Sequence, residues 1–135
     1  LQDSPLLIYG ASIGSQVATK IALDNNEKVD ALILDGAMMS FTDIALATSP
    51  AEYHEVIRKY VVSPYSAKEN IAVLKDINVL FIHSQTDFVP FSGAKEMYES
   101  AQCTKKFWEF EGDHLTASVN YPEEFRKYIG ELVAE

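Results

Sequence analysis

The chain has 135 residues, 47% of them hydrophobic and 23% charged, and its 20 acidic and 11 basic residues give a formal net charge of −9. These values are ordinary for one globular domain, which we place at residues 1–135, and they exclude wholesale disorder. The sequence has no basic run, so we expect neither a nucleic-acid partner nor an anionic membrane surface. It also has no apolar run near the roughly 20 residues of a membrane span. The single cysteine, Cys103, favours a reducing compartment, and we expect a cytoplasmic protein.

The first predicted elements are a strand, a tight turn and a helix. Leu6–Tyr9 is apolar and rich in β-forming residues, and it leads into the Gly-x-Ser-x-Gly sequence of residues 10–14. A helix is predicted from this turn to about Asp24. Its apolar residues recur every four positions, at Ile13, Val17 and Ile21. This order is typical of a nucleophile elbow, in which a strained turn exposes the hydroxyl of Ser12 at the start of a helix.

Strands and helices alternate along the rest of the chain. Further strands are predicted at Val29–Leu34, Asn78–His83 and Lys106–Phe110, and further helices at about 66–74, 92–101 and 121–132. Ser66 with Glu69 reads as a capping box, and Asn120 with Glu123 as the start of the last helix. The buried face of that helix is expected to carry Tyr121, Phe125, Ile129 and Leu132. Alternation of this kind predicts an α/β fold, a four-stranded parallel sheet flanked by helices.

Three side chains that suit nucleophilic catalysis follow predicted strands. Ser12 comes after the first strand, Asp87 lies in the loop after the third, and His114 lies in the loop after the fourth. Functional groups gather at the carboxyl ends of parallel strands, so these three are expected to meet. His114 would take the proton of Ser12, and Asp87 would orient the imidazole. The backbone N–H of Ile13 is the expected oxyanion donor.

The sequence resembles the C-terminal half of an α/β-hydrolase, close to the branch of serine aminopeptidases, lysophospholipases and acyl esterases. Three segments carry the resemblance: the elbow at residues 9–14, the strand and acid loop at residues 79–90, and the histidine loop at residues 111–114. Two small departures are Ser15 and Ser84, which stand where the family often has glycine. Neither replaces a predicted catalytic group.

The resemblance also implies a cap and a missing half. The stretch at about residues 37–65, expected to be irregular or short-helical, corresponds to the family's cap, so Met38, Met39 and Phe41 are predicted to line an acyl pocket. Family members carry further strands before the elbow strand, and the second oxyanion donor lies in a loop among them. Leu6–Tyr9 would then be an apolar sheet edge, which we expect a partner to cover, most simply a second copy in a homodimer.

Several other titratable residues are expected to have structural roles or to face solvent. Asp35-Gly36 is expected to be the turn that ends the second strand. Some hydrolases keep their acid at this place, so Asp35 is the alternative to Asp87 for that role. His83 is expected to be structural, His54 to be a solvated helix residue, and Asp113 to be a turn residue. No cluster shows metal-ligand spacing, and we expect neither a metal nor a cofactor.

Two kinds of function follow from these patterns. The first is a serine hydrolase that cleaves an ester, thioester or amide of a small acyl-containing substrate through an acyl-serine intermediate; transfer to an acceptor other than water would use the same chemistry. The second is a hydrolase-like module that keeps the three residues but acts in assembly or interaction. The apolar, aromatic-bearing cap favours modest acyl chains over charged peptides.

Overall fold

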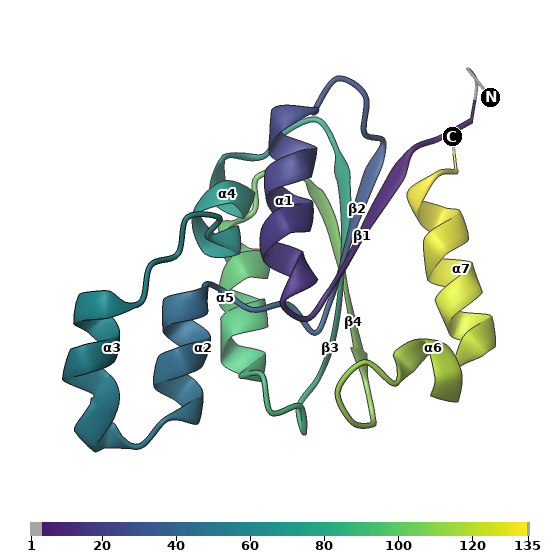
Figure 1. The fold of residues 1–135 in the computed structure, drawn as a ribbon. Helices are drawn as coiled ribbons and strands as arrows, with labels where there is room; N and C mark the ends of the chain where they lie inside the picture. The colour runs from purple at the N-terminus through teal and green to yellow at the C-terminus, as the bar shows by residue number, and fades with distance from the viewer. Residues whose placement is uncertain (1–3, 135) are drawn as a thin grey trace.

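A computed structural model describes residues 4–134 and shows one parallel sheet (Figure 1). The strands are β1 (Leu7–Ala11), β2 (Ala31–Asp35), β3 (Asn78–Ser84) and β4 (Thr104–Phe110), in the spatial order β1-β2-β3-β4. Every neighbouring pair is parallel, and helices lie in each of the crossovers that join the strands. The prediction of a four-stranded parallel sheet flanked by helices is confirmed.

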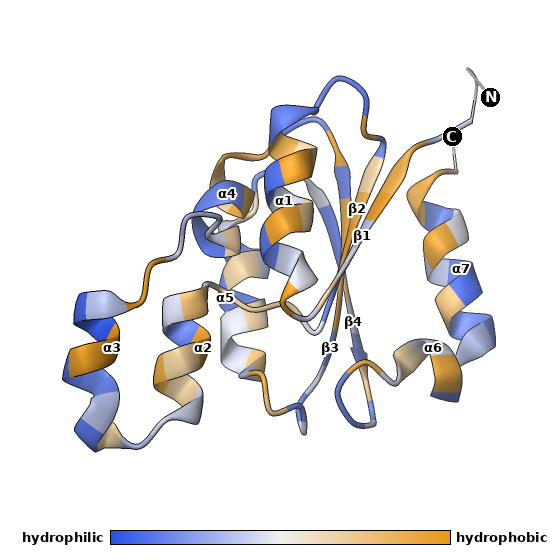
Figure 2. Ribbon diagram, viewed as in Figure 1, coloured by the Kyte–Doolittle hydropathy of each residue, from blue (hydrophilic) through white to orange (hydrophobic). Residues whose placement is uncertain are grey.

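Helices cover both faces of the sheet (Figure 1). One face carries α1 (Gly14–Asp24), α4 (Ala67–Val73) and α5 (Phe91–Ser100), and the other carries α6 (Ala117–Asn120) and α7 (Pro122–Leu132). The pleat of β2 sends Leu32 and Leu34 into the first layer and Ile33 into the second, and all three are buried. The two central strands, β2 and β3, are accordingly buried along nearly their whole length. Figure 2 shows β1 and β2 as mostly hydrophobic, whereas β4 carries more hydrophilic residues.

Helix α1 turns a different face to the sheet from the one its apolar spacing suggests. Its buried residues are small or polar: Ser15, Gln16, Ala18, Thr19 and Ala22. Ile13, Val17 and Ile21 instead face outward, with 61%, 48% and 41% of their surfaces exposed. The close approach to β1 explains the choice, because a Cβ on Gly10 would lie 2.6 Å from the Cβ of Ala18. Only small side chains fit there, so the larger apolar residues are left on the outside.

The C-terminal segment also differs from the prediction at one point. Asn120 does not cap the last helix: it is the final residue of α6, and α7 starts at Pro122 without a side-chain cap. Proline suits the first turn of a helix because its missing N–H would have no partner there. The predicted apolar face is correct, since Tyr121, Phe125, Ile129 and Leu132 all pack in the second layer. The Ser66 cap is also confirmed, because its hydroxyl accepts the Glu69 N–H.

The segment expected to be irregular or short-helical forms a helical hairpin beside the sheet (Figure 1). It comprises α2 (Phe41–Thr48), a 3-10 turn η1 (Ala51–Tyr53) and α3 (His54–Tyr60). Ser40 caps α2 by accepting the Asp43 N–H at 3.0 Å. Thr42 bonds to the Ser63 hydroxyl and so fixes the return of the chain after α3.

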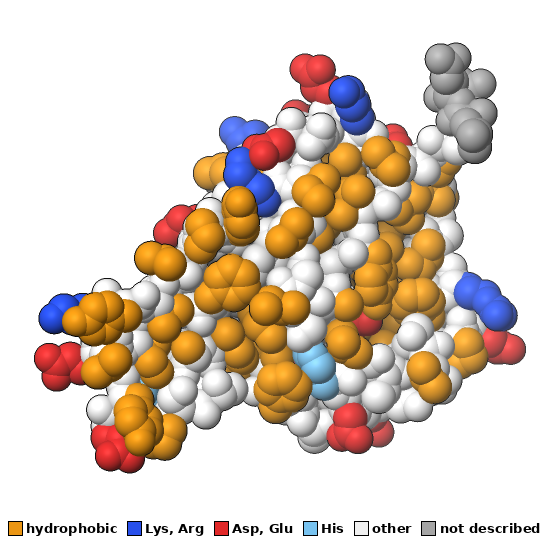
Figure 3. Space-filling model, viewed as in Figure 1, with side chains coloured by type: hydrophobic (Ala, Val, Ile, Leu, Met, Phe, Trp, Pro, Cys, Tyr) orange, Lys and Arg blue, Asp and Glu red, His pale blue; other side chains and the backbone are white. Residues whose placement is uncertain are grey.

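Strand β1 lies at the edge of the sheet, as expected, and its outer face is apolar and open. Leu6 and Tyr9 are 47% and 45% exposed. Together with the outward residues of α1 they place many apolar side chains on the face over β1 and α1 (Figure 3). The unpaired N–H and C=O groups of such an edge are the groups with which another strand could pair.

Candidate active site

Ser12 occupies the turn between β1 and α1 in a strained conformation. Its φ is +51°, in the left-handed region that non-glycine residues rarely adopt. The turn is fixed by the Ser12 N–H, which donates to the Asp35 carbonyl at 2.8 Å, and by the Ser15 N–H and hydroxyl, which both donate to the Ser12 carbonyl. These bonds hold the Ser12 hydroxyl at the N-terminal end of α1, beyond the carboxyl ends of the strands.

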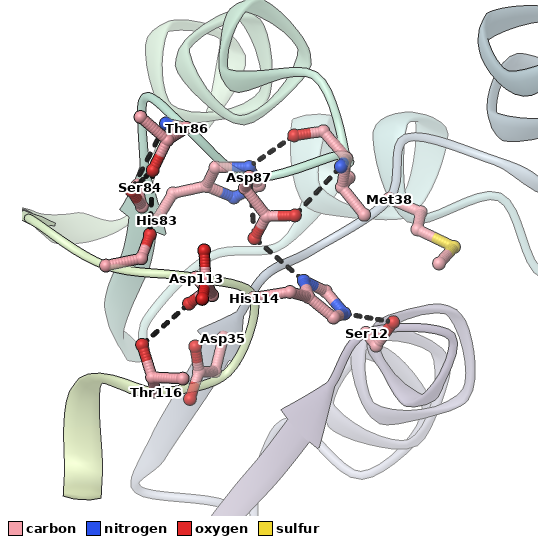
Figure 4. A network of polar contacts seen from close by, with 12 residues as sticks. Ser12, Asp35, Met38, His83, Ser84, Thr86, Asp87, Asp113, His114 and Thr116 are labelled. Carbon is pink, nitrogen blue, oxygen red and sulfur yellow. Dashed lines mark hydrogen bonds and ion pairs between the residues drawn. The ribbon is translucent and has the colours of Figure 1, made fainter. Parts of the chain in front are cut away.

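His114 and Asp87 reach the same point from two other loops (Figure 4). The Ser12 Oγ lies 2.8 Å from His114 Nε2, and His114 Nδ1 lies 2.7 Å from Asp87 Oδ2. The Asp87 side chain is 1% exposed and the His114 side chain 17%. The other oxygen of Asp87 accepts the Val89 N–H at 2.8 Å, which fixes the carboxyl group. With Nδ1–H donating to Asp87, Nε2 is left to accept the Ser12 proton.

A backbone donor lies directly after the serine. Among residues 4–134 no acceptor takes the N–H of Ile13, which belongs to the first turn after Ser12. Helix N-termini leave such groups unsatisfied, and they carry positive partial charge. The Ile13 N–H is therefore available to a negatively charged oxygen beside Ser12.

Two residues that the sequence reasoning missed hold the imidazole in place. Gly36 has a φ of +60°, and a Cβ there would lie 2.6 Å from His114 Cε1, so the ring occupies the space that glycine leaves. The dipeptide Asp35-Gly36 signalled a turn, but nothing local to it signalled the histidine. Phe88 packs its ring edge-on against His114 with centroids 4.6 Å apart while remaining 61% exposed. It covers the imidazole on the solvent side.

Asp35 is buried at the end of β2 but does not bond to His114. Its carboxyl accepts the hydroxyl of Tyr9 from the edge strand, and its other oxygen is buried without a partner among the described residues. Burial raises the pKa of the Asp35 carboxyl, against the opposing pull of Tyr9, His114 and His83. Burial and the neighbouring carboxyl also raise the pKa of Tyr9 above its ordinary value. In this geometry Asp87 bonds to the imidazole of His114, and Asp35 bonds to the hydroxyl of Tyr9.

The remaining singled-out residues lie around the site. His83 is buried and its Nε2 contacts the Val89 carbonyl at 2.8 Å, beneath the acid loop. Asp113 is exposed, and its carbonyl accepts from Thr116 in the turn before α6. His54 differs from the prediction of a solvated side chain, because it is partly buried, contacts the Ser49 carbonyl at 3.0 Å and lines a pocket.

That pocket lies between the α2–α3 hairpin and the start of α5, with a volume of about 330 Å³. Met38 and Met39 line it, whereas Phe41, on the first turn of α2, does not. Met38 is tied to the turn of Ser12, because its N–H donates to the Ser15 hydroxyl at 3.1 Å and its carbonyl accepts from the Gln16 amide. Gln16 also accepts the Ala67 N–H at 2.9 Å, so one buried amide links α1, the segment after β2 and α4.

Two known proteins are similar to this chain in sequence over nearly its whole length. The chain is 28% identical to the α/β-hydrolase domain-containing protein WAV2 of Arabidopsis thaliana, over 94% of this chain and 46% of that protein. It is also 28% identical to the uncharacterized protein YfhR of Escherichia coli K12, over 95% of this chain and 45% of that one. The chain thus spans about half the length of these relatives. No family model matches.

Solved structures give the same fold at lower identity. The esterase domain of a Rhodothermus marinus protein superposes with a TM-score of 0.70 at 20% identity, covering 94% of this chain and 58% of that one. An α/β-fold hydrolase of Bacillus anthracis superposes with a TM-score of 0.70 at 14% identity, over 96% of this chain and 67% of that one. The chain therefore has the fold of part of an α/β-hydrolase.

In residues 4–134 no group of three or more His, Cys, Asp or Glu is placed to hold a metal ion. No helix in that range is long and apolar enough to cross a membrane.

Proposed function

We propose that this chain carries the catalytic residues of a serine hydrolase that cleaves a carboxylic ester, thioester or amide through an acyl-serine intermediate. The observation that supports it most directly is the unbroken line of contacts from Ser12 to His114 to Asp87, at 2.8 and 2.7 Å. Distances of this size are those at which a nucleophile, a base and an orienting acid act together.

Each residue has a definite step in the reaction. His114 Nε2 takes the Ser12 hydroxyl proton as Oγ attacks the substrate carbonyl, and the Ile13 N–H stabilises the oxyanion that forms. The C–O, C–S or C–N bond then breaks, and His114 gives its proton to the leaving group. Water, deprotonated by His114, next attacks the acyl-serine, and collapse of the second tetrahedral state returns the proton to Ser12. Asp87 holds the imidazole in the required tautomer throughout.

A fluorophosphonate probe and an ester assay test this proposal. The probe should label Ser12 in the intact chain, and p-nitrophenyl acetate turnover should disappear in Ser12→Ala. Ser100→Ala, at the exposed end of α5, is the matched control and should keep both properties. Absence of labelling in folded protein, or turnover that survives Ser12→Ala, would refute the proposal.

We further propose that the open edge of β1 is covered in the working protein, most simply by β1 of a second copy. The apolar surface over β1 and α1, and the exposed Tyr9 on that edge, support a strand or apolar partner there. The partner also matters for the rate of catalysis. Ile13 supplies one oxyanion donor, and losing one donor typically costs about 10²–10³ in turnover, so a partner that supplied a second donor would raise the rate by about that factor. Sedimentation at micromolar concentration tests the dimer, and a strictly monomeric profile would count against it.

The same exposed surface favours a second function, an interaction or assembly module that does not catalyse. Ester turnover that depends on Ser12 would exclude it.

We also propose a reducing, cytoplasmic setting from the single free thiol of Cys103, which cell fractionation would test.

A further inference from the structure

Phe88, in the loop after β3, is the most exposed of the seven phenylalanines. It is 61% exposed, whereas each of the other six is buried or partly buried. Its ring nevertheless has a fixed neighbour, because it packs edge-on against the His114 imidazole with centroids 4.6 Å apart. One side of this aromatic ring thus touches the candidate base, and the rest of it is open to a ligand.

The loop holds Phe88 in this position from both sides. Asp87, the residue before it, bonds to His114 Nδ1, and Val89, the residue after it, donates its N–H to Asp87 at 2.8 Å. The Val89 carbonyl in turn contacts Nε2 of the buried His83 at 2.8 Å. Because the backbone on either side is fixed, a ligand that packs on the Phe88 ring does not have to order the loop first.

The chemistry proposed above places the leaving group beside the same imidazole. His114 Nε2 lies 2.8 Å from Ser12 Oγ, takes its proton, and then donates that proton to the leaving atom (Figure 4). Such a transfer needs about 2.6–3.2 Å between the two heavy atoms. A group attached to the leaving atom therefore starts at the imidazole, and Phe88 is an exposed apolar side chain that this imidazole contacts.

The charges around the imidazole favour an uncharged leaving group. No lysine or arginine occurs in the segments that follow the four strands, which are residues 12–13, 36–40, 85–90 and 111–116. The last of these segments carries two exposed carboxylates, Glu111 and Asp113. Arg58 lines the pocket between the α2–α3 hairpin and α5, and neither Phe88 nor His114 lines that pocket. An anionic leaving group would thus meet like charges and no basic side chain from these segments.

We propose that Phe88 is a specificity-determining residue that binds the leaving group, and that the substrates are esters of neutral apolar alcohols, aromatic ones above all. As the oxyanion collapses, the C–O bond to the alcohol breaks, the alcohol oxygen takes the proton from His114 Nε2, and the acyl group stays on Ser12. The free alcohol then departs along the Phe88 ring. Leaving groups that carry a carboxylate or a phosphate are disfavoured. This proposal rests on the serine hydrolase function proposed above.

Three acetate esters that differ only in the alcohol test the proposal on the full chain: ethyl acetate, benzyl acetate and 4-(acetoxymethyl)benzoate. In the wild type, kcat/KM for benzyl acetate should exceed that for each of the other two by roughly tenfold. Phe88→Ala should lower the benzyl-to-ethyl ratio by roughly fivefold or more, and Phe88→Tyr, which keeps the ring, should keep the ratio within about twofold. Tyr60→Ala removes an exposed aromatic ring from the end of α3 and is the matched control, which should leave the ratio unchanged.

The ratio distinguishes substrate binding from a structural role. If Phe88 only supports the imidazole, Phe88→Ala lowers kcat/KM for the ethyl and benzyl esters by the same factor, and the unchanged ratio overturns the proposal. A wild type that prefers 4-(acetoxymethyl)benzoate to benzyl acetate would also overturn it.

A binding measurement separates this inference from the proposed activity. Benzyl alcohol, the product, should shift the NMR signals of the Phe88 ring and of the His114 imidazole in Ser12→Ala, and adding Phe88→Ala should abolish the shift at His114. Binding of this kind without ester turnover in the wild type would keep the leaving-group site and reject the hydrolase. Turnover that depends on Ser12, with an unchanged benzyl-to-ethyl ratio in Phe88→Ala and no shift at Phe88, would do the reverse.

Discussion

Replacing Gly36 with alanine tests the site through the residue that packs against the His114 ring. A Cβ built there lies 2.6 Å from His114 Cε1 and 2.9 Å from Nδ1, whereas ordinary contacts begin at 3.4 Å. The imidazole would have to withdraw by about 0.8 Å to accept the methyl group. It cannot do so freely, because Ser12 and Asp87 hold its two nitrogens and Phe88 packs against the ring.

Two magnitudes follow from this geometry. A displacement near 1 Å in a catalytic group costs about 10²-fold in rate, so kcat for p-nitrophenyl butyrate should fall by about that factor. The φ of +60° at position 36 costs a non-glycine residue about 1–2 kcal/mol, which should appear as a lower free energy of unfolding in denaturant. Rate and stability therefore drop together.

The control is Gly130→Ala, whose added Cβ meets nothing within 4 Å. It should keep the wild-type kcat and gain up to about 1 kcal/mol in stability, because alanine is the better helix former. If folded Gly36→Ala hydrolysed the ester within twofold of the wild type, the imidazole would not depend on this clearance, and the account of the site would be wrong.

Three further predictions concern other groups. Asp87→Asn should lower kcat by about 10⁴-fold in ester assays while circular dichroism stays native, since the amide favours the wrong tautomer of His114. The raised pKa of Asp35 makes the wild type lose stability as the pH rises above the pKa that this carboxyl has in the unfolded chain. In denaturant titrations, the stability of Asp35→Asn relative to the wild type should therefore be greater at pH 7 than at pH 4. An equal difference at both pH values would contradict this. Leu32→Ala, at a fully buried position in β2, should lower the free energy of unfolding by about 2–5 kcal/mol, and a loss below 1 kcal/mol would contradict the layered core.

Much of the fold was predictable because its signals are local. Each predicted strand overlaps an observed one, and the Ser66 cap depends on a residue three positions away. The two differences in the helices have one kind of cause. The orientation of α1 was decided by the clearance at Gly10, and the start of α7 by Pro122 after a short separate helix, and neither follows from hydrophobic spacing.

The pocket shows the same limit more strongly. Met38 and Met39 were predicted to line an acyl pocket because a family resemblance placed a cap there, and the pocket in the structure includes both. Gly93 and Val89 were missed, because they come from α5 and the loop before it, some fifty residues further along the chain. Only the tertiary structure brings the two segments together, with Met39 against Gly93.

The sequence by itself determined where a strained serine turn would form and which polar residues would follow the strands, since both depend on residues adjacent in the chain. Only the tertiary structure decided which of them meet. Ser12 and His114 are separated by 102 positions in the sequence, yet Ser12 Oγ lies 2.8 Å from His114 Nε2. Asp35 is much nearer to Ser12 in the sequence, and it bonds to Tyr9 instead. The reason is the order of the parallel strands, which sets the neighbours at their carboxyl ends and leaves space at Gly36 for one imidazole.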